Sequence, residues 1–149
     1  MRNDSLTANG ADGAGWQFWT RGCIPLYMWC ILIYMNTEIT TSTRTNTVGH
    51  VTRFEIIEGG EQIAFLDAHT ATGLILNVVV IPARQGEGLA RQLFEHGDDT
   101  LGLYHVPAWG RTPEGDAFAE AMGGYTMDDE EAGTLLGLTY DEELDMWVA

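Results

Sequence analysis

Apolar and polar residues alternate in two neighbouring segments of the chain, residues 51–57 and residues 62–68. Alternation with a period of two is typical of β-strands that bury one face. The residues between the two segments include Gly59-Gly60, and a glycine pair in this position favours a tight hairpin turn. The pattern therefore predicts an antiparallel β-hairpin.

Residues 74–81 are almost continuously apolar and rich in β-branched side chains, which predicts a central strand buried on both faces. Pro82 ends this strand because proline has no N–H group for the ladder. Apolar residues at helical spacing then predict a helix over residues 88–97, closed by Gly97. Residues 101–106 predict a short strand. We expect it to run parallel to the strand at residues 74–81, because a helix connects the two.

A second helix is predicted to start at Thr112, which suits the N-cap, followed by Pro113, which suits the first helical position. We expect this helix to end at Gly123-Gly124. The acidic tail then offers two closing strands, residues 135–138 and residues 146–148. These elements predict an α/β protein with a mixed, mostly antiparallel β-sheet flanked by helices.

Residues 1–35 differ in composition from the rest of the chain, because they contain as many Arg as acidic residues and both cysteines. Their apolar run, residues 23–35, is shorter than the ~20 residues that span a bilayer, and it lacks the flanks of a secretory leader. Three interpretations stay open: an upstream extension before a translation start at Met35, an element packed on the domain, or a membrane signal. Residues 36–50 are rich in threonine and predict a polar linker. We expect the folded domain to occupy residues 51–149.

The chain is strongly acidic, with 22 Asp and Glu residues against seven basic residues, and the printed sequence contains no Lys. This balance argues against a nucleic-acid-binding protein, because affinity for phosphate backbones comes from clustered basic side chains. The acidic surface is either simply solvated or favours cationic partners. Both cysteines lie in the first quarter of the chain, and the four histidines do not have the spacing of a zinc site. We therefore expect no structural metal and a cytoplasmic location.

The chemically informative segment runs from Val80 to Arg91 and places two glycines, Gly86 and Gly88, in a turn between a strand and a helix. N–H groups in the first turn of a helix lack intrahelical acceptors, and the helix dipole favours negative charge beside them. The glycines let a ligand approach the backbone, and Arg84 or Arg91 would add positive charge. The segment predicts a phosphate-binding turn; the alternative is that the glycines only make a tight connection.

Two familiar phosphate-binding motifs do not fit this segment. The P-loop requires Lys followed by Ser or Thr, and the chain has no Lys. The dinucleotide fingerprint requires a third glycine where Arg91 stands.

The segment instead resembles motif A of the GNAT superfamily of N-acetyltransferases, commonly written Val-x-Pro-x-x-Arg/Gln-x-x-Gly-x-Gly/Ala. The matching residues in this chain are Val80, Pro82, Gln85, Gly88 and Ala90. Residues 117–124 also resemble the Phe-Tyr-x-x-x-Gly-Phe ending of that family. The resemblance covers residues 51–124.

In that family the loop amides bind the pyrophosphate of acetyl-CoA, and the preceding strand, one of a splayed parallel pair, contacts the pantetheine arm. The resemblance therefore implies that acetyl-CoA is the acyl donor. It also implies an N-acetyltransferase that acts on an amine of a small molecule or protein, and the acidic surface favours a cationic amine. The residues implied to contact acetyl-CoA are Val78, Val80, Gln85, Gly86, Glu87, Gly88, Leu89, Ala90 and Arg91.

The resemblance is less complete at the catalytic groups. The tyrosine that family members often use as a general acid would fall at Ala119. The remaining candidates for moving a proton are Tyr125, His69, Tyr104 and His105. Two alternatives to an enzyme stay open: an inactive GNAT-fold protein that binds acetyl-CoA or a protein partner, and an interaction module whose acidic residues 128–131 engage a basic partner. The sequence leaves the oligomeric state open.

Overall fold

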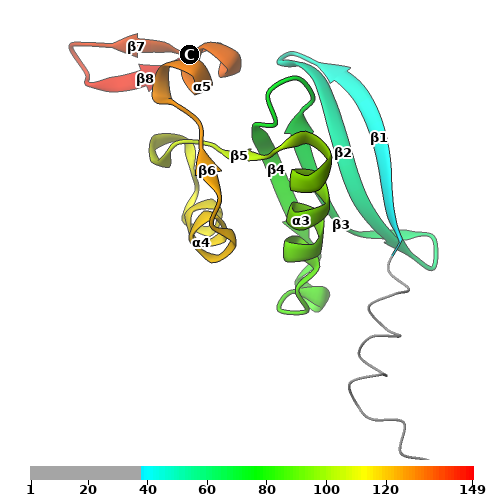
Figure 1. Cartoon of the computed structure of the whole chain (residues 1–149). Coiled ribbons are helices and arrows are strands. Elements are labelled where there is room, and N and C mark those ends of the chain that lie inside the picture. The colour runs from blue at the N-terminus through cyan, green and yellow to red at the C-terminus, as the bar shows by residue number, and fades with distance from the viewer. Residues whose placement is uncertain (1–37) are drawn as a thin grey trace, which may run out of the picture. The chain divides into compact units, whose positions relative to one another are not determined.

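Four antiparallel strands form the main sheet, in the order β1-β2-β3-β4 (Figure 1). The computed structural model describes residues 38–149, so the interpretations of residues 1–35 lie outside the described part. The strands are β1 (Ile39–Asn46), β2 (Gly49–Glu58), β3 (Glu61–His69) and β4 (Ile75–Val80). Strands β2 and β3 pair antiparallel, and Gly59 and Gly60 turn between them with φ values of 60° and 85°. The predicted hairpin is therefore confirmed.

The other elements all follow β4 along the chain. They are η2 (Pro82–Arg84), α3 (Leu89–Leu101), β5 (Tyr104–His105), η3 (Ala108–Gly110), α4 (Pro113–Met122), β6 (Tyr125–Thr126), α5 (Asp129–Leu136), β7 (Thr139–Asp141) and β8 (Met146–Val148). The described part is therefore a mixed α/β structure, as the sequence predicts.

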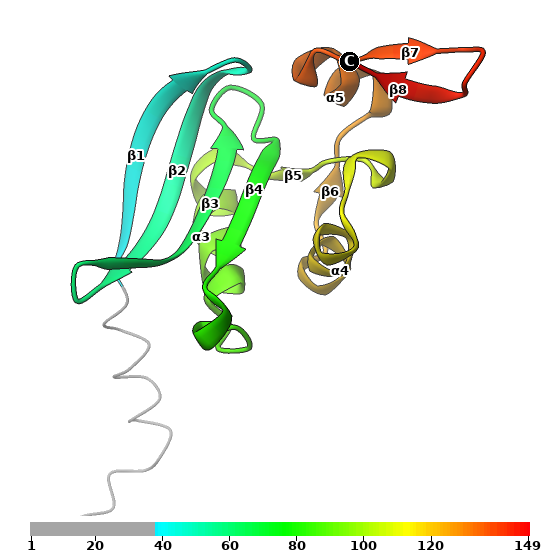
Figure 2. The ribbon, with the colours of Figure 1, turned by 180° about the vertical axis from the view of Figure 1, so that it is seen from behind.

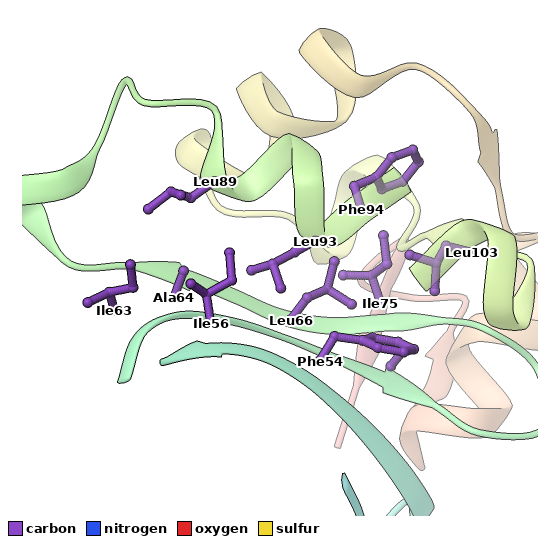
Figure 3. Close-up of a cluster of buried hydrophobic side chains, with 11 residues drawn as sticks. Phe54, Ile56, Ile63, Ala64, Leu66, Ile75, Leu89, Leu93, Phe94 and Leu103 are labelled. Atoms are coloured by element: carbon purple, nitrogen blue, oxygen red, sulfur yellow. The ribbon is translucent and has the colours of Figure 1, made fainter. Parts of the chain in front are cut away.

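The main hydrophobic core lies between one face of the sheet and α3 (Figures 2 and 3). Leu93 points from α3 toward sheet residues that include Leu66, whereas Phe94 points to the other side of the helix. Full burial of a large apolar side chain contributes about 2 kcal/mol. Since Leu89 is the first residue of α3 and 5% exposed, this packing also fixes the turn between β4 and α3.

Helix α3 is longer than the sequence predicts, because Gly97 lies inside it and the helix ends only before Gly102. A Cβ atom on Gly97 would lie 2.9 Å from Leu103 Cδ1 and 3.1 Å from Phe54 Cε2. Gly97 thus permits close packing of the helix on the sheet. A glycine of this kind looks the same in the sequence as one that ends a helix.

The predicted linker is also wrong, since residues 39–46 form strand β1 and pair with β2 along their whole length. Threonine-rich segments favour strands, because the branched side chain fits a pleated surface. Almost all of β1 is exposed, so the segment has no apolar alternation to reveal it. The folded body consequently begins at Glu38 rather than at residue 51.

Strand β4 lies at the edge of the main sheet, not at its centre as predicted. Its residues alternate between more and less exposed positions instead of being buried on both faces. The expected parallel pairing with the segment after α3 is reduced to one bridge, between Leu74 and Tyr104. Strand β5 pairs in parallel with β6 instead. The predicted parallel pairing of β4 with this segment is therefore wrong beyond the single bridge.

Helix α4 begins as predicted, with Thr112 Oγ1 accepting a hydrogen bond from the Gly115 amide at 3.1 Å, and it ends at Gly123. In the tail, residues 146–148 form β8, which pairs with β7. The prediction of a strand at residues 135–138 is wrong, because Leu135 and Leu136 complete the last turn of α5.

Trp147 of β8 packs directly on Gly133 of α5. A Cβ atom on Gly133 would lie 2.3 Å from Trp147 Cζ3, so the indole occupies the space that a side chain would need. The same indole stacks on Trp109 of η3, with ring centroids 5.4 Å apart. The β7–β8 hairpin is thus attached both to α5 and to the segment between β5 and α4.

We expect Gly133→Ala to destabilise the fold. Alanine gains about 1 kcal/mol over glycine inside a helix, but overpacking costs about 1–3 kcal/mol, and the rigid indole places this site at the costly end. Urea unfolding followed by tryptophan fluorescence should show a lower free energy of unfolding and a more solvent-exposed tryptophan. Gly115→Ala is the control, since its Cβ would meet its nearest neighbour at 3.4 Å. Equal stability of the two variants would contradict the packing.

Candidate functional site

A cleft of about 420 Å³ lies between β4 and the segment that contains β5 and the start of α4. We call it the β4–α4 cleft. Its β4 wall and floor are formed by Ile75, Leu76, Asn77, Val78, Val80, Gln85 and Ala90. Its opposite wall is formed by His105, Val106, Gly110, Arg111, Thr112, Glu114, Gly115 and Phe118. Clefts of this size are typical of small-molecule sites.

The cleft exists because β4 separates from β5 after a single bridge at Leu74 and Tyr104. At this point β4 contains a bulge: Ala68 pairs with Ile75, but the preceding Asp67 pairs with Asn77, which leaves Leu76 as an extra residue. A bulge bends its strand and disturbs the ladder locally, and bulges are frequent beside functional sites. The bulge at Leu76 thus lies at the narrow end of the cleft.

The outer edge of β4 offers backbone groups to the cleft. Alternate residues of a strand turn their backbone N–H and C=O groups to opposite sides. The Ile81 amide donates to Ile63 O at 2.9 Å, so the odd-numbered residues at this end of β4 turn theirs toward β3. The even-numbered Val78 and Val80 turn their backbone groups away from β3. The side-chain amide of Gln85 donates to Val80 O at 3.2 Å, consistent with this direction. An extended ligand can therefore pair with this edge.

The turn before α3 presents unpaired amides. Gly86 and Gly88 have φ values of 84° and 81°, a region that glycine adopts without strain. The first backbone bond of the helix runs from the Gln92 amide to Gly88 O. Within residues 38–149, the amides from Gly86 to Arg91 have no hydrogen-bond acceptor. Such a helix start attracts anions, because unpaired N–H groups and the helix dipole act together.

The two arginines near this turn have different surroundings. Arg84 donates to Glu58 and Glu87, so its positive charge is largely offset. The ion pair lowers the pKa of Glu58 below its usual value and raises that of Arg84. Arg91 donates to Ala121 O at 2.8 Å and forms no ion pair with any residue that the structure describes. Arg91 is therefore the better source of positive charge for an anion.

Arg111 stabilises the opposite wall of the cleft. Its guanidinium donates to Val106 O, Asp116 Oδ1 and Thr126 Oγ1 at 2.6, 2.9 and 2.9 Å. These three bonds connect the loop after β5, the first turns of α4 and strand β6. Arg111 thus holds the wall in place, and three of its five N–H groups donate within the protein itself.

His105 is among the residues that line the cleft and is 4% exposed. Its Nε2 is 2.7 Å from Gly123 O, and because a carbonyl oxygen only accepts, Nε2 carries the proton. The ring stacks on Phe94 with centroids 5.3 Å apart and meets Phe118 edge-on. Burial lowers the pKa of His105 below its ordinary value, so the ring is neutral at neutral pH.

The structure brings four of the predicted donor-binding residues, Val78, Val80, Gln85 and Ala90, to the walls of one cleft. Gly86, Glu87 and Gly88 form the exposed turn at its end, whereas the Leu89 side chain is buried in the core and contributes only its amide. The sequence did not reveal Arg111 or Phe118 as cleft residues. Their only signal was the helix start at Thr112, which brings the loop before α4 to the cleft.

The catalytic candidates other than His105 lie outside the lining of the cleft. Tyr104 and Tyr125 are neighbours on β5 and β6, and Tyr125 is 76% exposed. His69 lies at the end of β3 and its Nδ1 is 2.9 Å from Thr72 Oγ1. Ala119 is buried in α4. Only His105 of the candidates is in the right place to meet a ligand of the cleft.

No group of three or more His, Cys, Asp and Glu side chains within residues 38–149 is arranged to hold a metal ion. None of the helices in this part of the chain is long and apolar enough to cross a membrane.

Comparison with known proteins gives no match to a family model, to a curated protein or to a solved structure. Any assignment of function therefore depends on the residues and on the geometry of the cleft.

The lowered pKa of His105 predicts a loss of stability in mild acid. The unfolded chain takes up this proton near pH 6.5, whereas the folded protein takes it up only at lower pH. Between these two values the unfolded state binds more protons, so the free energy of unfolding falls as the pH falls. Urea unfolding at pH 7 and pH 5.5 should show this decrease in the wild type and less of it in His105→Gln. His50→Gln, at an exposed position, should keep the wild-type slope because His105 is still present.

Proposed function

We propose that this chain is a GNAT-type N-acetyltransferase that transfers an acetyl group from acetyl-CoA to an amine. The observation that carries the proposal is the convergence of Val78, Val80, Gln85 and Ala90 on one cleft that ends at a turn with unpaired amides. The same positions carry the resemblance to motif A, so a sequence pattern and a site geometry agree.

The polar groups of the cleft match the parts of the donor in order. The pyrophosphate would accept hydrogen bonds from the amides of residues 86–91, beside the charge of Arg91. The pantetheine arm would extend along β4 and pair with the backbone of Val78 and Val80. The thioester would then lie at the narrow end, near Leu76 and His105. The nucleotide would remain outside the 420 Å³ of the cleft.

The formal charge of −15 supports a cationic acceptor, such as a polyamine, an aminoglycoside or a basic protein terminus. A protein of this charge attracts cations and accelerates their encounter. It also repels the phosphates of the donor over long distances, which makes the local donors of the turn before α3 more important.

A catalytically inactive acetyl-CoA-binding protein is the second candidate. Two observations favour it: Ala119 stands where the family often has tyrosine, and neither Tyr104 nor Tyr125 lines the cleft. The two candidates share the binding site and differ only in turnover. An interaction module that uses residues 128–131 would need neither binding nor turnover.

We expect acetyl-CoA to raise the thermal stability of the wild type. Ligand at 100 times its dissociation constant stabilises a protein by about 2.7 kcal/mol. Gly88→Glu should abolish the shift, because a carboxylate at the turn repels and crowds the pyrophosphate. Gly59→Glu is the matched control: it places the same side chain on another glycine of positive φ, in the open β2–β3 turn. An unchanged shift in Gly88→Glu would count against the assignment of the turn.

Turnover separates the enzyme from the inactive binding protein. The wild type should release free thiol from acetyl-CoA in the presence of cationic amines, measured with a thiol reagent over a panel of polyamines, aminoglycosides and basic peptides. Stabilisation without thiol release would leave the second candidate. If the wild type showed no stabilisation by acetyl-CoA and no thiol release, both the enzyme and the inactive binding protein would be excluded.

A further inference from the structure

We propose that His105 is the proton acceptor for the attacking amine in the β4–α4 cleft, acting through Nδ1. This inference rests on the proposed acetyltransferase function and names a residue that the resemblance to the family does not supply. Four observations carry it: the place of His105 along the strand, its fixed tautomer, its packing, and its burial against the cleft.

In the proposed binding mode, His105 lies beside the acyl group of acetyl-CoA. It follows Tyr104, which forms a parallel bridge with Leu74, just before β4, and this is the only such bridge in the described residues; His105 is therefore the first residue after the point where the strands part. Leu76, the bulge residue on the facing strand, also lines this end of the cleft. The amide-bearing turn lies at the other end of β4. From Leu76 to Val80 the strand extends roughly 13 Å, at about 3.3 Å per residue.

The hydrogen bond to Gly123 determines which nitrogen can accept a proton. Nε2–H donates to the carbonyl of Gly123, so Nδ1 of the neutral ring holds the free lone pair. No hydrogen bond to Nδ1 is found among residues 38–149. When Nδ1 takes a proton, the bond from Nε2–H to the carbonyl remains and becomes stronger, because its donor is then charged. The carbonyl of Gly123 thus serves as the orienting partner of the base.

The ring is held rigidly in this orientation. Phe94 of α3 stacks on it with an interplanar angle of 10°, and Phe118 of α4 meets it at 70°. Two charged groups act on it, and they oppose one another: Arg111 lowers the pKa of His105, whereas Asp98 of α3 raises it. Desolvation is the larger influence and keeps the ring neutral. A neutral, oriented imidazole is ready to accept a proton at neutral pH.

The proton balance of the reaction is complete without any further reagent. The acceptor enters as an ammonium ion and gives one proton to Nδ1, which leaves a free amine. The amine nitrogen attacks the thioester carbon, so a C–N bond forms and the C–S bond breaks. The leaving thiolate takes the proton back from His105, and the second proton of the nitrogen goes to water. The products are the amide, the free thiol and one released proton.

His105→Gln tests this role, because the glutamine side-chain amide can still donate to Gly123 O but cannot take up a proton. Loss of a general base costs 10²–10⁴-fold in rate. We expect kcat/KM for the best amine of the panel to fall at least ~100-fold at pH 7, while the acetyl-CoA-dependent stabilisation stays unchanged. The deficit should shrink as the pH approaches the pKa of the acceptor amine, because the free amine then forms without a base.

His69→Gln is the matched control. His69 is also a poorly exposed histidine with a hydrogen-bonded ring nitrogen, but it is not among the residues that line the cleft. Its replacement should leave the pH profile of kcat/KM unchanged. A loss of activity that is equal at all pH values in His105→Gln would indicate a packing role and overturn the proposal.

A second measurement needs no variant. In the wild type, kcat/KM should decrease with falling pH along a one-proton limb whose midpoint equals the pKa of His105, read from the NMR shifts of its ring. Separate midpoints would overturn the role of His105 even if His105→Gln failed to fold. If the wild type is active and His105→Gln has the same kcat/KM, only the role of His105 as proton acceptor is excluded. A wild type without turnover would remove the proposed enzyme and this inference together.

Discussion

The structure depends on the separation of β4 from the parallel strand beside it. A strand with a free edge normally pairs with another strand or is shielded. Here the extra residue in β4, Leu76, disturbs the β3–β4 ladder close to the single bridge between Leu74 and Tyr104, and the chain returns through α3 to a β5 that pairs with β6. The free edge of β4 therefore faces a cleft instead of another strand. A fully paired sheet would have no space for a ligand here.

Two sets of contacts keep the cleft open. On the side of β4, the packing of Leu89 and Leu93 on the sheet fixes the start of α3, and with it the turn that carries the unpaired amides. On the opposite side, the three hydrogen bonds of Arg111 join the loop after β5 to α4 and β6. Each wall is rigid by itself. A site built on such supports needs little reorganisation when a ligand binds.

Features with a local cause could be predicted from the sequence. The β2–β3 hairpin, the Thr112 N-cap and the strand–turn–helix order around Gly86 and Gly88 each depend on neighbouring residues. The strand β1, the position of Gly97 within α3 and the edge location of β4 depend on contacts between distant segments, and the predictions for them were wrong. The place of His105 at the narrow end of the cleft follows from the bulge and the single bridge, neither of which has a signature in the sequence.

The contact between Gly133 and Trp147 constrains how this part of the chain can change over evolutionary time. The indole of Trp147 fills the volume next to the Gly133 α-carbon, so position 133 cannot accept a side chain while Trp147 is in place. A chain that acquires a side chain at 133 must first lose bulk at 147, and the loss also removes the stacking on Trp109 beside the cleft. Drift in the tail is thereby coupled to the wall of the site, although the two are far apart along the chain.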